Sequence, residues 1–167
     1  MRRALVIVLV LPLAVILFPD RAQADCTDPA EPGVRWVRCL KNGLELGAVD
    51  LENARLSNSS FSRADLSGAN MRNIDGRRTK FVSANLAGAN LAGAILREAD
   101  FTSSNLSKAD LTGVDLRDAA LFRADLREAN LTGARLDGAD FLNADLSGAI
   151  WTNGTTVCAE GSLGQCK

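Results

Sequence analysis

The 167-residue chain contains no histidine and no tyrosine, and it has only four prolines. Without histidine, no side chain has an ordinary pKa that suits general-base catalysis at neutral pH. The 19 basic and 20 acidic side chains nearly balance, so the strongly basic surface that binds phosphate backbones is also lacking. Hydrophobic residues make up 47% and charged residues 23%, which is typical of a folded domain. These absences disfavour histidine-based catalysis and predict no nucleic-acid partner.

Long apolar runs are scarce as well, and the longest covers residues 4–18. Two arginines precede this run, and the small-residue pattern Ala22-Gln23-Ala24 follows it, as before a signal-peptidase cleavage site. Pro12 interrupts the run, which falls short of the roughly 20 residues that span a bilayer. We interpret residues 1–24 as a secretory signal peptide, with a retained membrane anchor as the alternative. After cleavage we expect no membrane segment and an exported location: the periplasm, a thylakoid lumen or the extracellular space.

What the chain does have is a five-residue repeat. A large apolar side chain occupies every fifth position over residues 46–151, with Gly76 as the exception. Two residues before it the side chain is usually alanine, and the residue between is usually aspartate or asparagine. A period of five fits neither the 3.6 of a helix nor the 2.0 of a strand. It fits a coil that turns every five residues, with the large and small side chains inside and Asp or Asn at the turns.

This tandem A(D/N)LXX pattern resembles the pentapeptide-repeat family over about two thirds of the chain, residues 46–151. The resemblance implies an all-β fold, the right-handed four-sided parallel β-helix. With four pentapeptides in each coil, the repeat makes a solenoid of about five coils, roughly 25 Å long at the spacing of paired strands. A second period agrees, because Phe61, Phe81, Phe101 and Phe141 lie 20 or 40 residues apart. We expect them to stack on one side, with Leu121 in the gap.

The four cysteines all flank the repeat. In an exported protein this placement predicts two local disulfides, Cys26 with Cys39 and Cys158 with Cys166. Bridges along the rod are disfavoured because its ends lie beyond disulfide reach. A zinc site is disfavoured because the spacings match no common ligand set and histidine is missing.

The open ends of such a solenoid need caps. We expect an N-terminal cap over residues 25–45 and a C-terminal cap over residues 152–167. Both segments look like the cysteine-bearing caps of exported pentapeptide-repeat proteins. A short helix after Pro32 would cover the first coil with residues such as Trp36 and Leu40, and Trp151 would seal the other end.

No group of residues in the sequence forms a recognisable catalytic or metal-binding set. The outward Asp and Asn recur as turn residues on every side, and no distinctive nucleophile or base accompanies them. Columns of aspartate bind calcium in some β-helices, but the Gly-rich nonapeptide of those proteins is absent. We therefore predict no catalytic residue, no cofactor and no metal site, and we do not expect an enzyme.

Outward residues 20 apart form columns along the rod, and one column is apolar at Val82, Phe122 and Leu142. We interpret it as a contact face for a protein partner or a second copy, with scattered surface residues, or a cap lying over them, as the alternative. A second column, Thr112, Thr132 and Thr152, predicts a flat uncharged side. This side would suit ice or a saccharide, and good β-stacking is the alternative.

Basic residues give the weakest candidates. Gly76 leaves a gap in the large column, so its coil is expected to bulge or loosen, with a basic loop for partners as the bolder interpretation. The column of Arg77, Arg97 and Arg117 has acidic neighbours, and we expect it to neutralise itself. The members of the predicted basic loop are Arg72, Arg77, Arg78 and Lys80.

These observations favour a non-enzymatic exported scaffold or protein-interaction module. Cytoplasmic relatives implied by the resemblance mimic DNA and bind type II topoisomerases, which is one alternative. Removing residues 1–24 leaves 16 basic and 19 acidic side chains, a net charge of −3, which is too small for a phosphate-like surface. An ice-binding or saccharide-binding solenoid is the other alternative.

Overall fold

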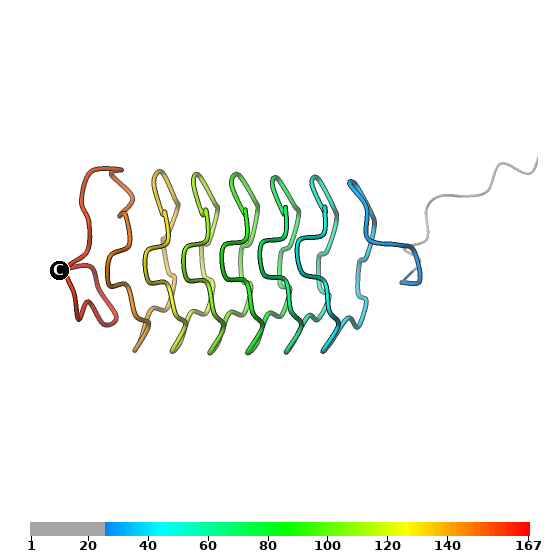
Figure 1. Cartoon of the computed structure of the whole chain (residues 1–167), viewed down its shortest axis with the longest axis horizontal. Coiled ribbons are helices and arrows are strands. Elements are labelled where there is room, and N and C mark those ends of the chain that lie inside the picture. The colour runs from blue at the N-terminus through cyan, green and yellow to red at the C-terminus, as the bar shows by residue number, and fades with distance from the viewer. Residues whose placement is uncertain (1–25) are drawn as a thin grey trace, which may run out of the picture.

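The computed structural model of the chain describes residues 26–167, so the predicted signal peptide, residues 1–24, lies outside the described part. The described residues wind into a straight rod of stacked coils, with residues 26 and 167 at opposite ends of the rod (Figure 1). From residue 31 to residue 150 every five residues contain two turn residues and one bridge residue. In the described chain the β-structure consists of isolated bridges, which run from Arg35 to Leu163.

The bridges set the coil at 20 residues. Each parallel bridge pairs a residue with the one 20 positions later, from Arg35 with Arg55 to Asn130 with Ile150. Backbone hydrogen bonds likewise join adjacent coils: the Phe81 amide donates to the Asp100 carbonyl at 2.7 Å, and the Asn85 amide to the Ala64 carbonyl at 3.0 Å. Four five-residue sides therefore complete one coil, and the backbone polar groups of each coil pair with those of its neighbours. The predicted all-β, four-sided parallel coil is what the chain forms.

The core is a narrow column of side chains along the axis. The large side chains at every fifth position are buried along most of the rod, and the small ones before them fit between the coils; near the C-terminal end Leu136, Phe141 and Trp151 are only partly buried. Phe61 and Phe81 stack with ring centroids 5.6 Å apart, and Phe81 and Phe101 stack at 4.9 Å. The stack predicted from the 20-residue spacing is confirmed here. Phe141 lies beyond Leu121 and contacts Trp151 edge to face at 6.2 Å.

The hydrogen bonds at the corners of the coil explain why aspartate and asparagine recur in the repeat. The Asp65 carboxylate accepts a hydrogen bond from the Ser67 amide at 3.0 Å, and the same turn recurs at many corners. The side-chain amide of Asn85 in turn donates to Asp65 at 3.0 Å, which joins neighbouring coils. The second turn residue has a positive φ, as at Gly68 with 63°. Glycine adopts this conformation without strain, and asparagine tolerates it better than most residues.

The N-terminal end differs from the prediction. The coil begins near residue 31 instead of residue 46, and no helix follows Pro32. Trp36 occupies a large core position, 2% exposed, with its ring 6.2 Å from that of Phe61. Leu40 is 79% exposed, so it does not cover the core. The five-residue register thus extends upstream, hidden in the sequence because Lys41 stands where a large apolar residue is expected.

Lys41 forms part of the N-terminal cap. Its ammonium group lies 3.7 Å from the centre of the Trp36 ring and donates to the Cys26 carbonyl at 2.7 Å. The apolar stem covers the core, and the charge remains solvated by the ring face and the carbonyl. The predicted disulfide between Cys26 and Cys39 is confirmed, with Cα atoms 5.4 Å apart.

The C-terminal cap is an antiparallel return. After the last coil, Val157 pairs with Ile150 and Leu163 pairs with Asp145. The Cys158 amide donates to the Ala149 carbonyl at 2.9 Å, which satisfies part of the open edge. The predicted disulfide between Cys158 and Cys166 is confirmed, with Cα atoms 4.8 Å apart. Trp151 is half-buried, so it seals the end together with this return.

The prediction of a bulge or loosened coil at Gly76 is wrong. The bridges from Arg55 to Asp75 and on to Ile95 are unbroken, and the Gly76 amide donates to the Ile95 carbonyl at 2.9 Å. Ile74 is fully buried at a position that usually holds alanine. A Cβ atom added to Gly76 would lie 2.8 Å from Leu96 Cδ2 and 3.5 Å from Ile74 Cδ1. The two neighbours fill the volume that a leucine at position 76 would need.

This packing gives a test of the core. Gly76→Leu restores the sequence pattern, yet we expect it to lower the free energy of unfolding by about 1–3 kcal/mol because the site is already full. The double variant Ile74→Ala/Gly76→Leu returns the large side chain to its usual position and should recover most of the loss. Urea unfolding measures both. A single variant as stable as the wild type would show that the coil has free space.

Candidate partner-binding surfaces

The apolar column lies on the outer face of the phenylalanine side. The Ser103 amide donates to the Phe122 carbonyl at 2.9 Å, and the Arg123 amide to the Leu142 carbonyl at 3.0 Å, so Phe122 and Leu142 are in adjacent coils. Val82 lies two coils before Phe122, with Thr102 between them. Leu142 is 59% exposed, and Val82 and Phe122 are half-buried. The apolar surface is therefore a contiguous pair, Phe122 and Leu142, with Val82 apart from it.

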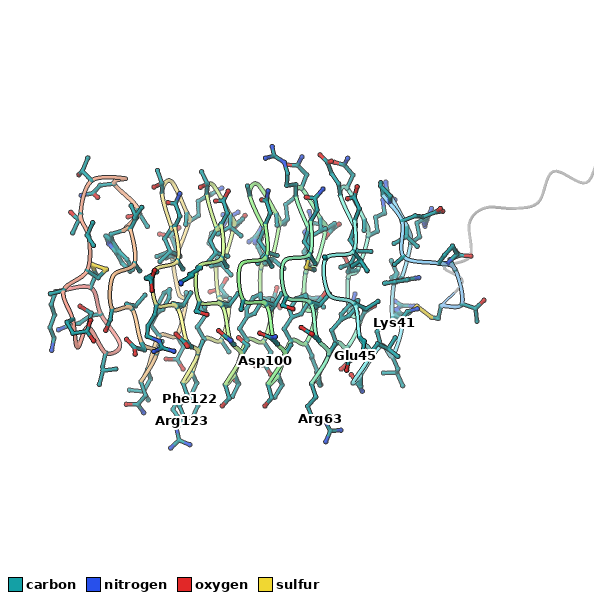
Figure 2. All side chains as sticks on the ribbon, in the orientation of Figure 1. Lys41, Glu45, Arg63, Asp100, Phe122 and Arg123 are labelled. Carbon is teal, nitrogen blue, oxygen red and sulfur yellow. A yellow bond between two sulfur atoms is a disulfide. The ribbon has the colours of Figure 1, made fainter. Side chains whose placement is uncertain are left out.

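Phe122 has a cationic neighbour. The Arg123 guanidinium carbon lies 4.9 Å from the centre of the Phe122 ring. Figure 2 shows Phe122 and Arg123 projecting from the same edge of the rod as Arg63. Aromatic and arginine side chains are the types enriched in protein interfaces. This corner combines both types on a rigid backbone.

Sequence reasoning missed the apolar residues of the C-terminal cap. Val157 is 62% exposed and Leu163 is 57% exposed. The Gly164 amide donates to the Ala144 carbonyl at 2.9 Å, so Leu163 lies beside the coil that carries Leu142. No signal in the sequence gives their exposure, because the cap leaves the five-residue register.

The threonine side is regular, and its hydroxyl groups serve its own turns. Thr112, Thr132 and Thr152 occupy equivalent places in adjacent coils and are half-buried. The Thr112 hydroxyl donates to the Asp110 carboxylate at 2.5 Å, and the Thr132 hydroxyl to the Asn130 side-chain oxygen at 2.6 Å. These two hydroxyl hydrogens are occupied within the turns, which favours a structural role.

The predicted basic loop does not form. Arg72 lies on one side, 4.0 Å from Glu52, while Lys80 lies on another side, paired in the backbone ladder with Asp100. Arg77 and Arg78 alone share a side, with carboxylate partners Asp75 and Glu98 respectively. The four residues lie on three sides because the regular coil turns two corners between residues 72 and 80, without a bulge to gather them.

The arginine column is neutralised in part. Arg117 donates two hydrogen bonds to Asp115, at 2.8 and 2.6 Å, and these hold the pKa of Asp115 down at about 2. The hydrogen bonds from Arg78 likewise lower the pKa of Glu98. Within residues 26–167, Arg97 has no ion pair. The expected self-neutralising ladder therefore holds for Arg77 and Arg117 but not for Arg97.

Among residues 26–167, no group of three or more His, Cys, Asp and Glu side chains is placed to hold a metal ion. In the same range no helix is long and apolar enough to cross a membrane.

Comparisons with known proteins agree on one family. The pentapeptide-repeat family model matches eight copies, over residues 45–75, 79–118 and 115–150. A pentapeptide repeat protein from the Arabidopsis thaliana thylakoid lumen is 31% identical, over 63% of this chain and 70% of that one, with a TM-score of 0.54. One from Nostoc PCC 7120 is 44% identical, over 52% and 67% of the two chains, with a TM-score of 0.27. QnrB1, a plasmid-mediated fluoroquinolone resistance protein, is 20% identical over 78% and 83%, with a TM-score of 0.44. A comparison with curated proteins gives no match.

The ion pairs predict the response to acid. The folded chain holds the pKa of Asp115 near 2, below its ordinary 3.8, so the unfolded chain binds more protons between these values. The stability from this pair is complete above about pH 4 and is lost as the pH falls towards 2. In Arg117→Gln this loss should shrink by about 1 kcal/mol, measured by urea unfolding at pH 4 and pH 2. An equal loss in both proteins would contradict the assigned cause.

Proposed function

Because the chain belongs to the pentapeptide-repeat family, whose fold is the right-handed four-sided β-helix, we propose that it is a non-enzymatic exported scaffold that binds a protein partner. The observation that carries the proposal is the contiguous apolar pair Phe122 and Leu142 on a rigid side of the rod. A flat rigid surface loses little conformational entropy on binding, so a small apolar patch contributes efficiently.

Export is supported by three independent features. Residues 1–24 carry the charge, apolar run and small-residue pattern of a signal peptide. Both disulfides are typical of oxidising compartments. The similar Arabidopsis protein comes from the thylakoid lumen. We place the mature chain in the periplasm, a thylakoid lumen or the extracellular space.

The contact face is centred on Phe122 and Leu142, with Val82 further along the rod. Arg123 beside the Phe122 ring adds a cation to the patch, and Leu163 of the cap extends it towards the C-terminal end. Such a surface suits a partner with an apolar centre and an acidic rim. A second copy of the chain is the other occupant that this face allows.

The alternatives have less support. A DNA-mimicking surface needs dense negative charge, whereas arginines alternate with carboxylates on this rod. An ice or saccharide surface on the threonine side has fewer donors to offer, because Thr112 and Thr132 give their hydroxyl hydrogens to their own turns.

Export has a direct test. Protein recovered from the exported fraction is expected to begin at Asp25 and to contain both disulfides, because the cleavage pattern ends at Ala24. Intact mass spectrometry gives the N-terminus, and alkylation before reduction gives the free thiols. Retention of residues 1–24, or labelling of any cysteine without reduction, would contradict the proposal.

Introducing negative charge into the proposed contact face tests its role in association. Phe122→Asp/Leu142→Asp places two carboxylates where the apolar surface must lose water, so we expect association to weaken more than tenfold. Pull-down from an extract of the exported compartment and size-exclusion chromatography measure partner binding and self-association. Circular dichroism should not change, because both positions face outward.

A matched control separates the face from net charge. Ala87→Asp/Ser107→Asp adds the same two charges at outward positions on a different side. This variant should retain the association of the wild type. If both double variants lose association, or neither does, the pair Phe122 and Leu142 is not the contact face.

A further inference from the structure

A basic face lies on the side of the rod whose core residues are Trp36, Leu56, Gly76 and Leu96. Its outward positions over residues 35–98 carry six arginines against two carboxylates, Asp75 and Glu98. The six are Arg35, Arg38, Arg55, Arg77, Arg78 and Arg97. Over the whole chain, by contrast, acidic side chains outnumber basic ones. Positive charge is therefore concentrated on one side of an otherwise weakly acidic rod.

Four of these arginines make no ion pair with the described residues. The four are Arg35, Arg38, Arg55 and Arg97. Arg35 and Arg55 are bridge partners in adjacent coils, and strands in such a ladder are about 4.8 Å apart. Arg97 likewise follows Arg77 one coil later. Like charges in adjacent positions destabilise a sheet, so the neighbouring pairs Arg35–Arg55 and Arg77–Arg97 do not themselves stabilise the fold, although Asp75 is the next ladder neighbour of Arg55.

Three of the six arginines line a hollow. Its lining consists of Ser57, Asn58, Arg77, Arg78, Arg97 and Glu98. The Ser57 hydroxyl donates to the Asp75 carboxylate at 3.0 Å, so this side chain stays down on the coil. Two short polar residues thus lie among long cationic ones, and Arg55 lies two residues before Ser57 along the chain. The hollow is open to solvent and has basic walls.

The same side already shows what its arginines bind. Arg78 pairs with Glu98 through two hydrogen bonds, at 2.8 and 3.2 Å, and Arg117 pairs with Asp115 in the same forked way. Arginine at these positions therefore reaches a carboxylate in a forked, bidentate geometry, the arrangement that guanidinium forms with carboxylate and phosphate oxygens. No aromatic side chain stands at the outward positions of residues 35–98 on this side, so the stacking that sugars and bases use is missing.

We propose that this basic face binds an acidic segment of a partner protein, with Arg55 and Arg97 pairing its carboxylates and Arg77 and Arg78 flanking the hollow. The segment would be a run of aspartates and glutamates lying along the rod. This site is separate from the apolar pair Phe122 and Leu142, which lies on a different side. An experiment can therefore contradict the role of either site without contradicting the role of the other.

The probe is a fluorescent 20-residue polyglutamate peptide titrated with the mature, disulfide-bonded protein. We expect saturable binding at low salt that weakens steeply as the salt concentration rises, because exposed charges are screened. Arg55→Ala/Arg97→Ala should weaken binding at least tenfold. Thermal unfolding should show that this variant is folded and as stable as the wild type, since neither side chain contributes an ion pair to the described chain.

Two controls make the result specific. Arg63→Glu changes the net charge by the same two units at an exposed arginine on another side, and it should alter affinity less than twofold. Arg55→Lys/Arg97→Lys keeps the charge but loses the fork, so an intermediate loss is expected. No binding by the wild type, equal losses in the alanine pair and Arg63→Glu, or no loss in the alanine pair would overturn the proposal. Tighter binding of phosphatidylglycerol vesicles or of heparin than of polyglutamate would overturn the choice of an acidic protein segment.

Discussion

The structure depends on the closure of the backbone ladder every 20 residues. Because each coil is too thin to bury anything alone, an inward side chain becomes buried only between the coils before and after it. Phe81 shows this, since it lies between Phe61 and Phe101 at stacking distance on both sides. The same closure sorts the outward residues into columns. Core, charges and surface patches are all set by position in the 20-residue coil.

At each end of the rod the terminal coil has a neighbour on one side only, and the two ends are capped in different ways. At the N-terminal end, Lys41 lies across Trp36 and a disulfide holds the preceding segment against the first coil. At the C-terminal end, the chain reverses and pairs antiparallel with its last coil before the second disulfide. Each device covers an edge that would otherwise expose core and unpaired backbone.

The parts that follow the repeat could be predicted from the sequence, and those that depend on neighbours could not. The phenylalanine column follows from the 20-residue spacing, and the local disulfides follow from the placement of the cysteines on either side of the repeat in a chain expected to be exported. The first coil was hidden because Lys41 occupies a core position, and its acceptance there depends on the Trp36 ring. The regular coil at Gly76 depends on Ile74 and Leu96, whose side chains fill the space beside it. Of the candidate surfaces, the columns were predictable, whereas the pairing of Arg117 and the isolation of Arg97 depend on turn geometry.

The central claim is that residues 20 apart pack as partners. Deleting residues 81–100 removes one coil and places Phe101 against Phe61, Leu116 against Gly76 and Asp118 beside Arg78. Deleting residues 81–85 removes less chain but shifts every later residue by one side, placing Leu86 against Phe61 and Phe101 against Gly76. The thermal unfolding temperatures of the two proteins test the claim. The account predicts that the protein lacking a whole coil unfolds cooperatively and at the higher temperature; equal temperatures, or the reverse order, would contradict it.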